Sequence, residues 1–128
     1  MAKVKPEKVC HSVEEASELI KQLANPNRLA IVCYLMEAPR TVADLEGDLG
    51  ISQPTLSQQI TQLRNAGIVT GQRQARSVTY RIEDARVLPL VQALRLVFAD
   101  LNDVRMEKRR AAAAARHLPA AEAFGMFD

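Results

Sequence analysis

Residues 52–82 read SQPTLSQQITQLRNAGIVTGQRQARSVTYRI, and this stretch decides the expected fold. In its first half Leu56, Ile60 and Leu63 recur at three- and four-residue spacing, which places them on one face of an α-helix. The opposite face carries polar side chains. The pattern therefore predicts a helix that is anchored by its apolar side and offers its polar side to solvent or to a partner.

Two short strands are expected after this helix. Residues 68–70 are β-branched, and residues 77–82 alternate apolar and polar side chains. The connecting residues 72–76 carry two arginines and would form a loop, or wing, between the strands. A capped helix followed by an arginine-bearing wing is typical of a winged helix that reads DNA.

Charge is distributed unevenly along the chain, although the net charge of its 128 residues is only +2. Residues 52–81 hold four arginines, six glutamines and no acidic residue, whereas residues 41–50 hold three acidic residues and no basic one. Because DNA is a polyanion, only the first of these segments can approach phosphate comfortably. We therefore expect the nucleic-acid-binding face in residues 52–81.

Two helices are expected directly upstream. Asn25 and Pro26 provide a cap and a first-turn proline for a helix that is apolar almost all round, which indicates a buried position. Thr41 caps a short helix that Gly50 ends, and Ser52 caps the next one. The two short helices and the turn between them predict a helix-turn-helix.

The first and last helices predict a second copy of the chain. Ser12 and Glu15 form a capping-box pattern for a helix over residues 13–24. A long helix is expected from Asp84 onward, with its apolar stripe formed by Val87, Leu90, Val91, Leu94, Val97, Phe98, Leu101 and Val104. One small core cannot cover both stripes, so the expected assembly is a homodimer.

The expected fold class is mainly α with a small β-hairpin, a dimeric winged helix-turn-helix. Its domain would span residues 12–105, after an N-terminal arm of residues 1–11 and before a basic helical extension and flexible tail of residues 106–128. The longest apolar run, residues 29–36, is far too short to cross a bilayer. We expect a cytoplasmic protein with no membrane partner.

Side chains of the polar helix and the wing are the candidates for DNA contact, because amides pair with adenine edges and arginines bind guanine or phosphate. The candidates are Gln53, Thr55, Ser57, Gln58, Gln62, Arg73, Gln74 and Arg76. The alternative for the helix is a merely solvated face. Arg64 is open between a DNA contact and a structural role as a cap or ion-pair partner. Lys108 to Arg110 are open between phosphate contacts and a solvated helix end.

The wording ANPNRLAIVCYL, TVADLEGDLGISQPTLSQQITQLRNAGIV and RSVTYRI resembles the arsenic-repressor family of dimeric winged-helix repressors over roughly residues 15–101. The resemblance implies a homodimer that binds double-stranded operator DNA. Within the family, Cys33 is similar to the sensing cysteine of the sulfide- and persulfide-responsive branch. That branch links this cysteine to a second one on the last helix, where this chain has Ala99.

Cys33 and Cys10 are the two cysteines, and their roles stay open. Cys33 is either a redox-sensing thiol that responds to reactive sulfur or an oxidant, or a small apolar core residue. Cys10, expected just before the first helix and with the positive charge of Lys8 nearby, is the better-placed thiolate and a candidate to bridge to Cys33. The function alternatives are a repressor without cysteine sensing and a protein-interaction module that has lost DNA binding.

No cofactor, metal or enzymatic activity is expected. The sequence offers no nucleophile–base pair, carboxylate pair or phosphate-cradling glycine loop. His11 stands beside Cys10, but two adjacent donors cannot complete a tetrahedral site, and His117 lies in the expected tail.

Overall fold

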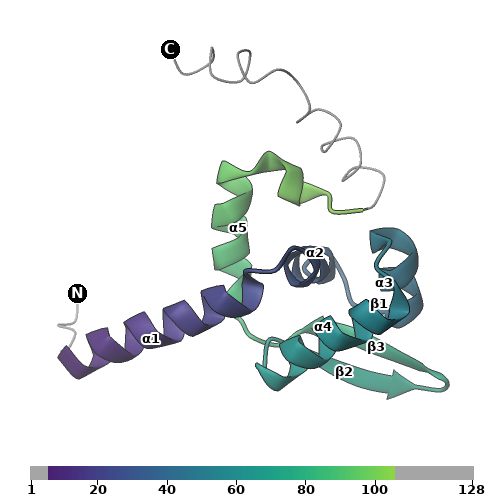
Figure 1. The fold of residues 1–128 in the computed structure, drawn as a ribbon, viewed down its shortest axis with the longest axis horizontal. Coiled ribbons are helices and arrows are strands. Elements are labelled where there is room, and N and C mark those ends of the chain that lie inside the picture. The colour runs from purple at the N-terminus through teal and green to yellow at the C-terminus, as the bar shows by residue number, and fades with distance from the viewer. Residues whose placement is uncertain (1–5, 106–128) are drawn as a thin grey trace, which may run out of the picture.

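The computed structural model describes residues 6–105, with side chains for residues 12–99 and 101–105. It contains five α-helices, a three-stranded antiparallel sheet and one 3-10 helix, η1 (Figure 1). In chain order these are α1 (Pro6–Leu23), α2 (Pro26–Leu35), β1 (Arg40–Thr41), α3 (Val42–Leu49), α4 (Gln53–Asn65), β2 (Val69–Gln74), β3 (Ser77–Ile82), α5 (Val87–Val97) and η1 (Ala99–Asn102). This confirms the predicted winged helix-turn-helix fold. The expected extension, residues 106–128, lies outside the described residues.

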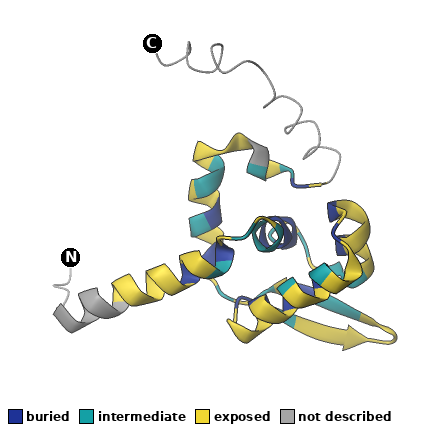
Figure 2. Cartoon of the chain, viewed as in Figure 1, coloured by how far each residue is buried: buried dark blue, intermediate teal, exposed yellow. Residues whose placement is uncertain are grey.

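Helix α2 forms the centre of the core, as its apolar sequence predicts. All residues from Ala30 to Leu35 are buried, and α2 is surrounded by the other elements (Figure 2). The Asn25 side chain caps the helix by accepting hydrogen bonds from the backbone N–H groups of Asn27 and Arg28 at 2.9 and 3.1 Å. The cap and the proline at its first turn therefore define where α2 begins.

Helices α3 and α4 form the predicted helix-turn-helix. At the start of α3, the Thr41 hydroxyl accepts from the Asp44 N–H and the Asp44 carboxylate accepts from the Thr41 N–H, which makes a capping box. Gly50 ends α3 in the left-handed conformation, at φ 67°, where glycine carries no steric penalty. The two helices are thus separated by a sharp turn whose geometry the sequence specifies.

The sheet has the strand order β1-β3-β2, with all neighbours antiparallel. The β2–β3 hairpin is longer than predicted: Gln72, Arg73 and Gln74 belong to β2, and only Ala75 and Arg76 form the turn. The second strand has the predicted bounds, but the predicted five-residue wing loop is wrong because cross-strand pairing continues along β2 as far as Gln74. Strand β1, which pairs with β3, was not predicted at all, because two residues are too short for a period-2 pattern.

Gly71 is required where it stands in β2. A Cβ at this position would lie 2.7 Å from the Tyr80 ring, closer than two carbon atoms can approach. Gly71 and Tyr80 are directly paired across the strands, and Tyr80 is buried. The glycine therefore leaves room for the tyrosine ring beside β2.

Helix α1 begins at Pro6, seven residues before the predicted start at residue 13. Ser12 lies inside the helix, so the predicted capping box at Ser12 and Glu15 is wrong. Proline is tolerated in a first turn, and the intervening residues include good helix formers. Cys10 consequently lies within α1 rather than before it, and its side chain lies outside the described part of the chain.

The predicted long last helix is also wrong in its second half. Helix α5 ends at Val97, Phe98 is extended at φ −119° and ψ 91°, and η1 follows. The chain then turns back so that Val104 is buried in the core, while Phe98 remains 57% exposed. Arg95 stabilises the turn by donating to the Leu101 carbonyl at 3.1 Å. The helix ends at Val97 because the chain must turn back there for Val104 to be buried.

None of the helices described in residues 6–105 combines the length and the hydropathy that crossing a membrane requires.

Candidate nucleic-acid interface

Helix α4 is amphipathic, and its buried face is the one that the sequence predicts. Leu56, Ile60 and Leu63 are buried, with exposed fractions between 0 and 4%. Ser52 occupies the N-cap position, but its side chain bonds the Thr55 hydroxyl at 3.4 Å rather than a backbone N–H. The apolar side therefore fixes α4 on the core and leaves its outer face to the solvent.

The predicted reading residues of α4 lie on or beside this outer face. Gln53, Ser57, Gln58 and Gln62 are exposed, and Thr55 is half-buried. Thr61 is also exposed, but its hydroxyl donates to the Ser57 carbonyl at 2.8 Å. Its hydrogen-bonding capacity is thus partly used within the helix, which sets it apart from the neighbouring glutamines.

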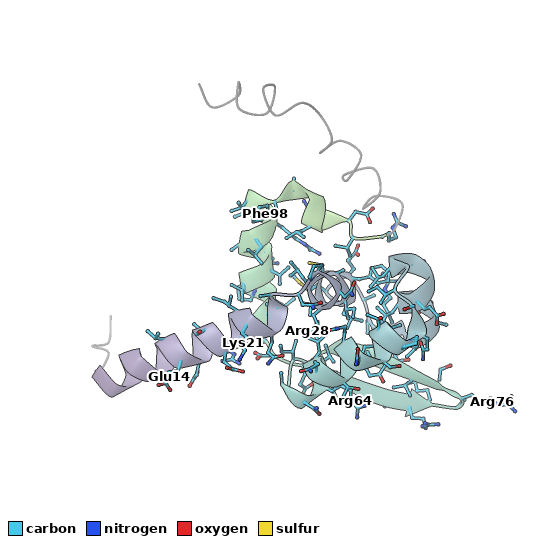
Figure 3. The ribbon with its side chains drawn as sticks, in the orientation of Figure 1. Glu14, Lys21, Arg28, Arg64, Arg76 and Phe98 are labelled. Atoms are coloured by element: carbon cyan, nitrogen blue, oxygen red, sulfur yellow. The ribbon has the colours of Figure 1, made fainter. Side chains whose placement is uncertain are left out.

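The hairpin places further basic side chains at a distance from the core. Arg73, Gln74 and Arg76 are all exposed, and Arg76 lies at the tip of the hairpin (Figure 3). Among the described side chains, no carboxylate is within ion-pairing distance of Arg64, Arg73 or Arg76. Arg81, nearer the base, has Glu83 at 4.0 Å. The arginines toward the tip are therefore available to an external anion.

A polar cluster that the sequence did not reveal supports the helix-turn-helix from behind. The Tyr34 hydroxyl of α2 donates to the Asp48 carboxylate of α3, and the Arg40 guanidinium lies 4.2 Å from the centre of the Tyr34 ring. Burial of the ring, together with this hydrogen bond, raises the pKa of Tyr34 to about 12. Tyr34, Arg40 and Asp48 lie within 14 positions of one another, but no periodic pattern in the sequence predicts their contact.

Cys33 lies in the middle of α2 and is completely buried. Burial raises the pKa of its thiol, and the guanidinium of Arg95 partly offsets this effect. Arg95 also donates to the Cys33 backbone carbonyl at 3.1 Å, which joins α5 to α2. The described side chains contain no cluster of histidine, cysteine or carboxylate groups suited to a metal ion.

Helices α1 and α5 expose large apolar side chains. They are Val13 and Ile20 on α1, Leu88, Leu96 and Val97 on α5, and Phe98 just after it. Their exposed fractions run from 41 to 89%. Large apolar side chains exposed on two helices of one chain indicate a surface that another molecule covers.

Comparison with known proteins gives the same assignment. Residues 25–70 match the family described as bacterial regulatory protein, arsR family. The biofilm growth-associated repressor of Xylella fastidiosa is 44% identical over 84 residues, which are 66% of this chain and 74% of that protein.

Two solved structures extend the comparison to the fold. The crystal structure of the transcriptional repressor BigR from Xylella fastidiosa superposes with a TM-score of 0.67 at 40% identity, covering 74% of this chain and 94% of that one. The solution structure of a homodimeric winged helix-turn-helix DNA-binding domain from Mycobacterium bovis gives 0.62 at 26% identity, covering 78% and 92%. In sequence and in fold, this chain belongs to the ArsR family of bacterial regulatory proteins.

Proposed function

We propose that the chain is a homodimeric transcriptional repressor that binds a palindromic operator in double-stranded DNA. The observation that carries this proposal is the surface of α4 and the β2–β3 hairpin, which is polar, exposed and free of acidic residues from position 52 to 81. Such a surface approaches a polyanion without electrostatic cost, whereas the exposed acids of α3 are excluded from it.

In this proposal α4 enters the major groove. Its amide and hydroxyl groups read base edges, and the hairpin arginines bind the neighbouring minor groove or its phosphates. The residues with these roles are Gln53, Thr55, Ser57, Gln58 and Gln62 on α4, and Arg73, Gln74 and Arg76 on the hairpin.

The homodimer is supported by the apolar side chains that α1 and α5 expose. A second copy would cover them, and the related domain from Mycobacterium bovis is described as homodimeric. Two reading helices about one DNA turn apart would then match an inverted repeat. A dimer across promoter DNA represses by excluding polymerase.

The test is selection of bound duplexes from a random library, followed by affinity measurement over a range of salt concentrations. A repressor selects an inverted repeat, and its affinity falls steeply with salt because phosphate contacts release counterions. Failure to enrich any sequence, together with a flat salt dependence, would favour the protein-interaction module instead.

We further propose that modification of Cys33 by reactive sulfur or an oxidant releases the DNA. Arg95 beside the thiol favours the thiolate, whereas burial opposes it, so reaction requires α5 and η1 to open away from α2. A bridge to Cys10 stays a prediction.

The mutant Cys33→Ser separates this sensor from a repressor that ignores thiol chemistry. Persulfide should lower the operator affinity of the wild type and leave that of the mutant unchanged. An equal response of both proteins would remove Cys33 as the sensor, and mass spectrometry of the treated wild type would reveal any linkage between Cys10 and Cys33.

A further inference from the structure

Arg28, in the first turn of α2, connects three helices. Its Nε donates to the Gln22 carbonyl in the last turn of α1 at 2.5 Å, and its Nη1 donates to Gln59 Oε1 on α4 at 2.8 Å. The Asn25 cap holds the backbone of Arg28 in place. The guanidinium therefore lies at a fixed point between α1 and α4 (Figure 3).

At the α1 end, the contact completes the end of a helix. The last carbonyls of a helix lack partners within it, and a cation there is favoured by the helix dipole. The Lys21 and Leu23 carbonyls accept from the backbone N–H groups of Ala24 and Asn25, and the Gln22 carbonyl accepts from Arg28. Arg28 thus acts as part of the C-terminal cap of α1.

At the α4 end, the contact falls on the border between the buried and the exposed face of the helix. Gln59 is half-buried and lies between the buried positions Leu56 and Ile60 on one side and the exposed Gln62 on the other. A hydrogen bond at this border resists rotation of α4 about its own axis. Such rotation would turn Gln58 and Gln62 away from a groove.

Open space lies between part of α1 and the C-terminal half of α4. A cavity of about 340 Å³ separates Glu15, Glu18 and Gln22 of α1 from Gln62, Asn65 and Ala66 of α4. The link through Arg28 bridges the two helices at one end of this cavity.

From this geometry we propose that Arg28 is a positioning residue for DNA recognition: it holds α4 at the rotation and at the distance from α1 that operator binding requires, and it does so without touching DNA. This inference rests on the proposed DNA-binding function. Without Arg28, α4 must be ordered when DNA binds, and that ordering reduces affinity.

The experiment is a double-mutant cycle with Arg28→Ala, Gln59→Ala and the double mutant, using a duplex selected by the wild-type protein. Each single mutant should bind about tenfold more weakly, the factor that loss of one charge-assisted hydrogen bond corresponds to. The double mutant should be no weaker than Arg28→Ala, because Gln59→Ala removes a bond that Arg28→Ala has already removed. Gln22→Ala is the matched control, since Arg28 bonds only its backbone carbonyl.

The salt dependence of affinity distinguishes positioning from direct contact. A positioning role leaves the slope of log affinity against log salt unchanged in Arg28→Ala, whereas loss of a phosphate contact reduces it by about 1. A reduced slope, or single-mutant effects that multiply in the double mutant, would overturn the inference. So would unchanged affinity of correctly folded single mutants.

Amide hydrogen exchange of the DNA-free protein tests the same inference independently of DNA. Exchange in α4 should be faster in Arg28→Ala and in Gln59→Ala than in the wild type and in Gln22→Ala. Unchanged exchange in α4 would overturn the positioning role. If the wild type selected no duplex while exchange changed as expected, the proposed function would fail and the Arg28 link would stand.

Discussion

Two exposed surfaces of this chain differ in the kind of side chain that they present to water. The surface of α4 and the hairpin lacks acidic residues, and the surface of α1 and α5 exposes Val13, Ile20, Leu88 and Leu96 to water. Amides and guanidinium groups are well solvated, so the first surface is stable in a single chain. Large apolar side chains are not, so the second surface is complete only when another molecule covers it.

The largest effect is expected from breaking the apolar surface. Ile20→Glu combined with Leu88→Glu should yield monomers, because two carboxylates would be buried in the interface. Operator affinity should then fall by about 10²–10⁴-fold, since each half-site binds alone. Sedimentation and DNA titration measure both outcomes.

Glu14→Arg provides the control, because it changes charge at an exposed position of α1 that lies on a different face of the helix from Ile20. The control should remain dimeric and bind normally. If the Ile20 and Leu88 double mutant stayed dimeric with full affinity, the apolar surface would have another partner.

The next largest effect is expected on the polar surface of α4, where Gln58 is assigned to base reading. Gln58→Ala should lower discrimination at one operator base pair by about 1–3 kcal/mol, the range for a side chain that reads a base edge. Thr61→Val is the matched control, because the Thr61 hydroxyl already donates to the Ser57 carbonyl. Binding to a set of single-base operator variants measures the change, and equal loss in both mutants would contradict the assignment of Gln58 as a reading residue.

A smaller effect is expected at the hairpin. Arg73→Ala and Arg76→Ala should each reduce the salt slope of binding by about 1 and weaken all sequences alike, as loss of a phosphate contact does. Arg86→Ala is the control, because Arg86 pairs with Asp84 at 2.7 Å and with Glu15 at 3.6 Å. A sequence-dependent loss at Arg73 or Arg76 would instead indicate base reading by that arginine.

The smallest effect on DNA binding is expected from the Tyr34–Asp48 hydrogen bond, which supports the helix-turn-helix and whose main effect is on stability. Because the pKa of Tyr34 is raised from 10.0 to about 12, the folded state holds the phenol proton more tightly than the unfolded state. The stabilisation is fully present below pH 10 and is lost as the pH rises toward 12. Tyr34→Phe should not show this loss, which denaturant unfolding would reveal as about 1 kcal/mol by pH 11. Affinity at neutral pH should change little.

The sequence was most informative where capping or helix-ending residues agree with the apolar periodicity. Asn25 with Pro26, Thr41 with Asp44, and Gly50 mark element boundaries that the structure confirms, because each satisfies local backbone groups. The same kind of signal misled at Ser12, where preceding residues extend the helix past the expected cap. A local capping pattern predicts a possible helix start but does not exclude a longer helix.

The second half of the last helix could not be predicted, because its break depends on a distant contact. The apolar spacing from Leu94 to Val104 is compatible with one continuous helix. Burial of Val104 and the bonds of Arg95 to Leu101 and Cys33 give the chain another way to cover the same residues. Pairing of β1 with β3 depends likewise on tertiary placement.

By itself, the sequence determined the order of the five helices and the β2–β3 hairpin, the buried face of α4 and the absence of acidic residues from positions 52–81. These follow from short-range rules, since side-chain period and capping act within a few residues. The tertiary structure alone decided that Arg28 links α1 to Gln59, that Tyr34 reaches Asp48 and that the chain turns back after Phe98. Those features join residues from separate elements, and their partners become neighbours only after the core has formed.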